Sequence, residues 1–203
     1  MPPKRPKANL AFEKTAWGKG FNLVAGIDEA GRGPLAGPVV AGAVILKTTD
    51  FKERIDDSKK LTAKQRERAF SELTKKTIFA VGFVDNYTID KINIANATIL
   101  AMQRALFNLI VKPDFVLIDG ILKIGVDMPC EYIKSGDAKS LSIAAASIIA
   151  KVTRDNIMRV YHKKYPAYDF FAHKGYGTHK HIYIIHKKGP CIIHRKSFLT
   201  RIF

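Results

Sequence analysis

Runs of apolar residues, bounded by glycine, proline and polar residues, predict four β-strands. The first run ends at Asp28 and Glu29, and a turn rich in glycine and proline follows it. The fourth run is wholly apolar, as expected of a strand buried on both faces, and it ends at Asp119. The four predicted strands cover residues 21–27, 39–46, 78–84 and 115–118.

Apolar residues at helical spacing predict three helices between and after these strands. Thr62 is a suitable N-cap for a charged helix through residues 66–73, and residues 89–110 predict a longer helix that a proline ends. Residues 140–161 predict a long helix with an alanine-rich, tightly packed first half, and Asp137 lies just before it. Acidic residues therefore stand beside the ends of two predicted strands and one predicted helix.

The composition restricts the class of protein. With 203 residues, 47% of them apolar, the chain can bury one good core and at most a small appended subdomain. Lysine and arginine outnumber the acidic residues by 34 to 18, and the net charge of +16 has the sign expected of a phosphate-binding surface. A generically basic protein, such as a ribosomal protein, carries the same charge, so composition alone leaves both classes open.

Residues 1–20 are rich in basic residues and proline, and they predict a flexible basic arm ahead of a catalytic unit over residues 21–203, with Trp17 as the one candidate anchor. The arm lacks the apolar segment of a secretory signal, and no later apolar run approaches membrane-spanning length. Cys130 and Cys191 lack the spacing of a disulfide framework or a cysteine zinc site. We therefore expect a reducing, cytoplasmic setting and no membrane partner.

Four acidic residues are candidates for one metal site: Asp28, Glu29, Asp119 and Asp137. Adjacent strand residues point to opposite faces, so the first two can share a site only where the strand ends and the backbone bends. Asp119 stands at a second strand end, where α/β sheets commonly place ligand sites. Converging carboxylates repel unless cations neutralise them, and hard oxygen ligands select Mg²⁺ or Mn²⁺. Two such ions can promote in-line phosphoryl displacement, so the pattern predicts a nuclease.

Each of these residues also has a structural interpretation. Asp137 is a candidate N-cap of the following helix, which is the more common role for such a residue on its own. Asp119 precedes a glycine and is a candidate turn residue, while Arg32 is a candidate ion-pair partner of the nearby carboxylates. The separate signals are weak, and the nuclease hypothesis depends on their combination.

Two further groups of polar residues remain open at this point. The histidines at positions 179, 181 and 186 are scattered like metal ligands, but without cysteines or an HExxH pattern we expect structural or surface roles. Several basic residues are either solvated charges or phosphate contacts, and the high net charge makes the two roles equally plausible. They are Lys59, Lys60, Lys151 and Arg154.

The run GIDEAGRGP at residues 26–34 is long enough to be a highly specific motif. It is similar to the opening motif of the ribonuclease HII family of type 2 ribonucleases H, and the sequence resembles that family. The later blocks match in order at residues 57–61, 117–120, 134–137, 145–155, 173–178 and 194–198. Where the family usually has a serine before the alanine pair of the fourth block, this chain has Ala144, so a polar role there is lost or moved to Ser142 or Ser147.

The resemblance implies an α/β, ribonuclease H-like fold: a mixed five-stranded sheet flanked by helices, with a helical C-terminal segment. It implies that the four carboxylates form the catalytic and metal site, with two Mg²⁺ or Mn²⁺ ions. The turn of Gly31, Arg32 and Gly33 would read the ribonucleotide, because glycine lets the backbone approach a 2′-hydroxyl, and Tyr176 would lie against the neighbouring deoxyribose. Lys59 and Lys151 are further expected substrate contacts.

The implied activity is endonucleolytic hydrolysis of the RNA strand of RNA–DNA hybrids, and incision 5′ of single ribonucleotides in duplex DNA that leaves 3′-OH and 5′-phosphate ends. The expected state is a monomer, and a replication clamp is a conceivable partner that no motif supports. Ribonuclease HIII, an integrase or a resolvase are alternatives within the fold, although the length disfavours ribonuclease HIII, which has an extra N-terminal domain. A basic RNA-binding or ribosomal protein is the alternative outside enzymology, and it would have no use for a carboxylate cluster.

Overall fold

Five strands form one mixed sheet in the order β3-β2-β1-β4-β5, in a computed structural model that describes residues 8–200. The β1–β2 and β2–β3 pairs are antiparallel, whereas β1–β4 and β4–β5 are parallel. The sheet confirms the expected mixed, five-stranded architecture. The strands are β1 Val24–Ala30, β2 Val39–Leu46, β3 Thr77–Val84, β4 Phe115–Asp119 and β5 Cys130–Ile133.

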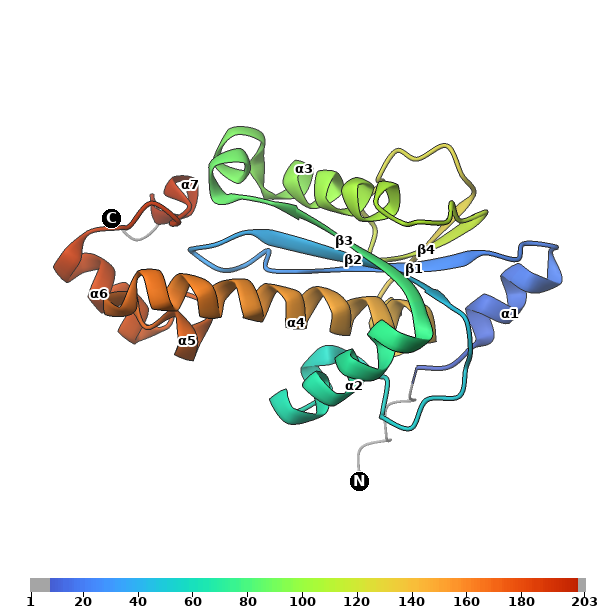
Figure 1. The fold of residues 1–203 in the computed structure, drawn as a ribbon. Helices are drawn as coiled ribbons and strands as arrows, with labels where there is room; N and C mark the ends of the chain where they lie inside the picture. The colour runs from blue at the N-terminus through green and yellow to red at the C-terminus, as the bar shows by residue number, and fades with distance from the viewer. Residues whose placement is uncertain (1–7, 201–203) are drawn as a thin grey trace, which may run out of the picture.

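Helices cover both faces of this sheet (Figure 1). Helix α3, Asn86–Phe107, lies on one face, and α4, Leu141–Lys164, crosses the other face with α2, Ala63–Lys76, packed beside it. The chain ends in short helices that gather beyond the C-terminal end of α4, which confirms the helical C-terminal segment. These are α5 Phe170–His173, α6 His179–Lys188 and α7 Lys196–Leu199, and single 3₁₀ turns occur at η1 Ser58–Lys60, η2 Gly136–Ala138 and η3 Pro166–Tyr168.

Helix α4 packs so closely on the sheet that two strand positions must be glycine. A Cβ atom on Gly26 of β1 would lie 2.2 Å from the carbonyl carbon of Ser142, and one on Gly42 of β2 would lie 2.6 Å from the carbonyl oxygen of Ala146. The alanine-rich first half of α4 is fully buried against these glycines. This contact fixes the start of α4, and the turn before it, beside the end of β1.

Most predicted elements are present with shifted ends. Strand β2 has the predicted bounds, and Thr62 caps α2 with a reciprocal capping box. Helix α3 is interrupted at Asn93, whose φ of 64° and ψ of 167° are not helical. Strand β1 starts later and continues to Ala30, so it does not end before Asp28 as expected, and β5 was not predicted.

The expected flexible arm over residues 1–20 is wrong for its described part, because residues 11–18 form helix α1 (Ala11–Gly18). The anchors of α1 are Glu13 and Ala16, which are 1% and 2% exposed, rather than Trp17, which is 37% exposed. Its Glu13 carboxylate binds the N-terminal turn of α4. Residues 1–7 lie outside the described residues.

The helices offer no route across a membrane. Within residues 8–200, none of them combines the length and the apolar character that a membrane-spanning helix needs.

Candidate active site

The parallel pairing of β1 with β4 brings three of the four carboxylates to one edge of the sheet. Ile27 is paired with Ile118, so Asp28 and Asp119, the next residue of each strand, follow side by side. Glu29 is the next residue of β1, which continues to Ala30. The site therefore lies beyond the carboxyl end of β4, where its neighbour β1 extends further.

Asp137 approaches from the turn η2, between β5 and α4. Gly136, its neighbour, donates its backbone N–H to the Asp119 carboxylate. Asp137 is not the N-cap of α4, because Ser140 has that role and accepts a hydrogen bond from the N–H of Ile143. The structure thus contradicts the capping interpretation of Asp137 and places this 5% exposed side chain next to Asp119.

Burial and neighbouring negative charges raise the pKa of three of the four carboxylates. Burial raises the pKa of Asp28 well above its usual value, and the charges of Glu29, Asp119 and Asp137 raise it further. Burial raises the pKa of Glu29 as well, with a further contribution from Asp119. Burial and the Asp119 charge likewise raise the pKa of Asp137. The charge of Asp119 thus acts on each of the other three carboxylates.

Two cationic side chains partly offset this repulsion. The Arg32 guanidinium lies 3.4 Å from the Glu29 carboxylate, and its charge works against the rise in the pKa of Glu29. The Lys59 ammonium lies 3.6 Å from the Asp137 carboxylate, although 82% of the lysine side chain is exposed. Both distances are longer than a strong charged hydrogen bond.

The donor chemistry of the cluster fits a hard divalent cation. Carboxylate oxygens are the ligands that Mg²⁺ and Mn²⁺ prefer, and burial together with neighbouring carboxylate charges raises the pKa of Asp28, Glu29 and Asp137. Within residues 8–200, however, no three histidine, cysteine or acidic side chains already stand in the geometry that holds one ion. The structure brings the four carboxylates near one another, but they do not surround a common point as the ligands of a bound ion do.

The glycine–arginine–glycine turn follows β1 and lies close to Tyr176. Gly31 has a φ of +101°, and a Cβ atom there would lie 2.1 Å from Nε of Arg154, so the turn requires glycine at this position. A Cβ atom on Gly33 would lie 3.8 Å from Cε1 of Tyr176. The structure therefore brings Tyr176, which is 43% exposed, to the turn beside the carboxylates.

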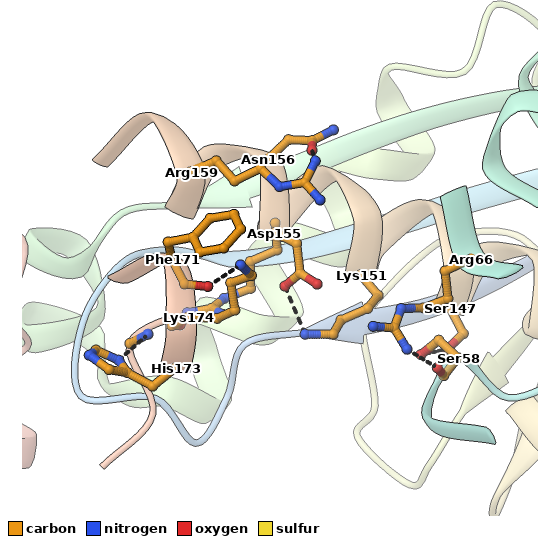
Figure 2. A network of polar contacts seen from close by, with 12 residues as sticks. Ser58, Arg66, Ser147, Lys151, Asp155, Asn156, Arg159, Phe171, His173 and Lys174 are labelled. Carbon is orange, nitrogen blue, oxygen red and sulfur yellow. Dashed lines mark hydrogen bonds and ion pairs between the residues drawn. The ribbon is translucent and has the colours of Figure 1, made fainter. Parts of the chain in front are cut away.

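The two expected lysine contacts come from η1 and α4. The Ser58 hydroxyl in η1 is hydrogen-bonded to the Ser147 hydroxyl in α4 at 2.8 Å, which ties the turn carrying Lys59 to the helix that carries Lys151 (Figure 2). The Lys151 ammonium lies 2.7 Å from the Asp155 carboxylate one turn further along α4. Ala144 is packed among apolar residues, so Ser142 and Ser147 hold the polar contacts of this part of the helix.

Known proteins share this sequence and fold. A model of the ribonuclease HII family matches residues 25–201. The chain belongs to this family. A ribonuclease HII from Acetivibrio thermocellus is 56% identical over 188 residues, 92% of this chain and 73% of that protein. One from Caldicellulosiruptor saccharolyticus is 51% identical over 192 residues, 94% of each chain.

Solved structures agree with the family membership. The crystal structure of ribonuclease H2 from Pyrococcus horikoshii matches with a TM-score of 0.75 at 28% identity, over 89% of this chain and 97% of that one. The ribonuclease HII in a complex with PCNA from Archaeoglobus fulgidus matches with a TM-score of 0.74 at 25% identity, over 86% and 94%. A Bst ribonuclease HIII in complex with Mn²⁺ shares the fold at a TM-score of 0.57 and 20% identity, over 82% and 63%.

Membership in the ribonuclease HII family makes the chain an endoribonuclease that depends on a divalent metal and cleaves the RNA strand of RNA–DNA hybrids. The alternatives of ribonuclease HIII, an integrase, a resolvase and a ribosomal protein are thereby excluded. The carboxylate cluster is the part of the structure suited to this hydrolysis.

Two arginines near the site were misread or missed in the sequence, whereas the structural role expected of one histidine is confirmed. Arg154, expected to be a solvated charge or a phosphate contact, is fully buried, as is Arg195. His181 is also buried and lies 3.1 Å from His194 between their Nε2 atoms, which confirms a structural role for it. The only sequence signal for Arg154 and Arg195 was their place inside segments that match the family, 145–155 and 194–198.

Proposed function

We propose that this ribonuclease HII incises duplex DNA on the 5′ side of single embedded ribonucleotides, in addition to cutting RNA–DNA hybrids, and that two divalent ions held by the carboxylate cluster promote the hydrolysis. The convergence of Asp28, Glu29, Asp119 and Asp137 on one sheet edge carries the proposal. Bound Mg²⁺ or Mn²⁺ would activate water and stabilise the leaving 3′-oxygen, which yields 3′-OH and 5′-phosphate ends.

The carboxylates reach ligand geometry by small side-chain rotations. The Asp28 carboxylate accepts the backbone N–H of Glu29 at 2.7 Å, which restrains it at the centre of the cluster. Glu29 is paired with Arg32 at 3.4 Å and Asp137 with Lys59 at 3.6 Å, distances longer than a strong charged hydrogen bond. In the proposal, these two side chains release their cations when divalent ions bind.

The turn of Gly31, Arg32 and Gly33 supplies the ribonucleotide recognition. Its backbone is accessible on one side, where Arg32 and Gly33 line a groove of about 840 Å³ beside α3 and α7. The 2′-hydroxyl distinguishes RNA from DNA, and a backbone free of side chains can approach it closely. The half-exposed Tyr176 ring, next to Gly33, is placed to pack on the sugar of the following deoxyribonucleotide.

Lys59 and Lys151 are proposed phosphate contacts on either side of the cluster. The exposed Lys59 ammonium can reach a phosphate oxygen while it stays near Asp137. Lys151 is 22% exposed and is oriented by Asp155. Both residues contribute affinity that does not depend on sequence. In the proposal the enzyme acts as a monomer in a reducing, cytoplasmic setting, which is consistent with the unpaired Cys130 and Cys191.

Cleavage-site mapping on two duplexes tests the proposal. One is a uniform RNA–DNA hybrid, and the other is DNA of the same sequence with a single ribonucleotide. We expect Mg²⁺- or Mn²⁺-dependent cuts in both, with one cut in the second duplex immediately 5′ of the ribonucleotide and a 3′-OH on the released end. Failure to cut the second duplex while the hybrid is cut would contradict the proposed incision activity.

A further inference from the structure

Two fully buried arginines bind the loop between β1 and β2. Arg195 lies at the N-terminal end of α7, and Arg154 lies in the middle of α4. Both arginine residues are 0% exposed, and neither forms an ion pair with any residue in the described range 8–200. Their hydrogen bonds go to backbone carbonyl oxygens instead. The arrangement is a clamp on the backbone and not a pair of salt bridges.

Arg195 binds the ribonucleotide-reading turn itself. Its Nη2 donates to the carbonyl of Gly31 at 2.6 Å, its Nη1 to the carbonyl of Arg32 at 2.9 Å, and its Nε to the carbonyl of Gly37 at 3.0 Å. The planar fork of a guanidinium can reach three carbonyls at once, which an ammonium group cannot do in the same geometry. Arg195 therefore fixes the orientation of two successive peptide groups of the turn.

Arg154 holds the neighbouring part of the same loop. It donates to the carbonyls of Ala36, Pro38 and Lys174 at 3.1, 2.9 and 3.0 Å. None of these carbonyls belongs to the peptide groups between Gly31 and Gly33. Arg154 thus supports the loop and the segment before Tyr176 and packs against Gly31, whereas Arg195 donates hydrogen bonds to the carbonyls of the turn.

The orientation of the carbonyls dictates where the amides point. A trans peptide is planar, so its N–H is directed opposite to its C=O. The carbonyl of Gly31 shares a peptide with the N–H of Arg32, and the carbonyl of Arg32 shares one with the N–H of Gly33. Because both carbonyls face the buried Arg195, both N–H groups face away from it.

Burying two charged guanidinium groups lowers the stability of the fold. This cost supports a role for the arrangement in recognising the ribonucleotide. Burial, with a smaller contribution from the charge of Arg154, lowers the pKa of Arg195 to about 9, so the group remains protonated at neutral pH. Two buried like charges that form no ion pair within residues 8–200 are a poor means of stabilisation compared with apolar packing. A cation bound to two carbonyls also polarises their peptides and strengthens the opposite N–H groups as donors.

We propose that Arg195 is a positioning residue for ribonucleotide recognition: by holding the carbonyls of Gly31 and Arg32, it directs the N–H groups of Arg32 and Gly33 at the 2′-hydroxyl oxygen of the bound ribonucleotide. The inference rests on the proposed function of the turn. It assigns the specificity of an exposed loop to a side chain that never touches the substrate.

The variant Arg195→Lys tests this role because it keeps the charge and loses the fork. We would measure kcat/KM on duplex DNA with one ribonucleotide, and the inhibition constant of the all-DNA duplex of the same sequence, which reports phosphate binding alone. We expect kcat/KM to fall about tenfold to a hundredfold, as for a small misplacement of a recognition group. The inhibition constant should change less than about twofold, because the phosphate contacts remain.

A matched control separates recognition from folding. Leu73→Ala removes a fully buried side chain from the core beneath α4, away from the turn, and lowers the melting temperature without altering Arg195. Assayed well below its melting temperature, it should keep the wild-type ratio of kcat/KM to the inhibition constant. If Arg195→Lys also keeps that ratio, the positioning role is overturned. If the wild type itself shows no preference for the ribonucleotide, the proposed function fails instead.

Hydrogen exchange on the wild-type protein tests the same inference without a mutation. In the absence of divalent ions, the amides of Arg32 and Gly33 should become protected when the ribonucleotide duplex binds, and less so with the all-DNA duplex. The amide of Val40 in β2 is a control that should not respond. Equal protection of the two turn amides by both duplexes would overturn the inference even if Arg195→Lys failed to fold.

Discussion

Glu13 of α1 and Ser142 of α4 are joined by two hydrogen bonds: the Glu13 carboxylate accepts the Ser142 backbone N–H at 2.8 Å and its hydroxyl at 2.7 Å. The same carboxylate oxygen accepts the Ser140 hydroxyl at 2.6 Å. An anion at the start of a long helix also interacts favourably with the helix dipole. Glu13 thus holds the N-terminal end of α4, three residues after Asp137.

Glu13→Ala should destabilise the protein by about 1–3 kcal/mol, because it leaves buried donors of Ser140 and Ser142 without their acceptor. Glu13→Gln retains one oxygen acceptor and should cost less. The free energy of unfolding from urea titrations measures both effects. Lys14→Ala, on the exposed side of the same helix, is the control and should remain within about 0.5 kcal/mol of the wild type. An equally small effect of Glu13→Ala would show that α1 does not anchor α4.

The sequence predicted the elements that carry a strong local pattern. Strand β2 is apolar throughout and has turn residues on both sides, so its bounds were predicted correctly. Thr62 caps α2 as predicted, and Gln65 completes a capping box with it. Strand β5 was missed because Cys130–Ile133 is a four-residue edge strand whose existence depends on its pairing with β4. The kink at Asn93 was missed because the apolar spacing continues through it.

The site was predicted in its residues and not in its supports. Asp28 and Asp119 each follow an apolar run that is visible in the sequence, and their adjacency follows from the parallel pairing of β1 with β4. Glu13 and Arg195 could not be found in the same way. Charge composition predicts solvation for such residues, and their burial depends on partners 129 and 164 positions away in the sequence. Long-range hydrogen bonds of this kind leave no periodic signal.

Asp28→Asn should lower kcat/KM by at least about a hundredfold, because it removes a charge from the centre of the proposed metal site. The metal-free variant should melt at a higher temperature than the metal-free wild type. Since the folded pKa of Asp28 is raised, the folded protein binds the proton more tightly than the unfolded chain, and stability is lost as the pH rises above the unfolded pKa of 3.8. The gain in Tm should therefore be larger at pH 8 than at pH 4.

Activity assays and calorimetry with and without Mg²⁺ measure these two effects of Asp28→Asn. Asp127→Asn, in the exposed loop before β5, removes the same charge away from the cluster and should change neither kcat/KM nor the melting temperature. Near-normal turnover of Asp28→Asn would remove this residue from the catalytic assignment.

His181 should make the stability of the protein sensitive to mild acid. Burial lowers its pKa to about 4 from an ordinary 6.5, so the unfolded chain binds a proton more readily than the folded protein over that interval. The stability provided by neutral His181 is complete above about pH 6.5 and is lost as the pH falls toward 4, by an amount on the order of 2 kcal/mol.

Melting temperatures between pH 4 and pH 8 test the role of His181. The variant His181→Asn should melt lower than the wild type at pH 8 and depend less steeply on pH below 6.5. His179→Asn, which changes an exposed histidine of the same helix, should leave the slope unchanged. Parallel pH profiles for wild type and His181→Asn would assign the acid sensitivity to another group.

Salt dependence should distinguish the two proposed phosphate contacts. Each lysine that neutralises a phosphate contributes about one unit to the slope of log Kd against log salt concentration. Lys59→Ala should lower the slope by about one, whereas Lys151→Ala should lower it less, because the Lys151 ammonium is already paired with Asp155 at 2.7 Å. Fluorescence titration of an all-DNA duplex at several KCl concentrations measures the slopes. Lys112 precedes the start of β4, at the opposite end of that strand from Asp119. Lys112→Ala should therefore leave the slope unchanged.

Tyr176→Ala separates recognition of the RNA–DNA junction from general hybrid cleavage. If the ring packs on the deoxyribose after the ribonucleotide, its loss should remove roughly 1–3 kcal/mol of binding, or about tenfold to a hundredfold in kcat/KM, as for other aromatic contacts with nucleic acids. The loss should be largest on DNA with one ribonucleotide, where one junction supplies all the recognition.

The ring of Tyr176 also has neighbours within the protein, so stability must be measured beside activity. It lies 5.8 Å from the guanidinium of Arg154, and its loop is held by the hydrogen bond between His181 Nδ1 and the Tyr176 carbonyl. Tyr176→Phe keeps the ring and should retain most of the activity on both duplexes. Equal losses of kcat/KM on the single-ribonucleotide duplex and on a uniform hybrid, together with a lowered melting temperature, would show that Tyr176 only supports the loop. A loss confined to the single-ribonucleotide duplex at an unchanged melting temperature would establish the ring as the reader of the junction, because no purely structural defect distinguishes these two substrates.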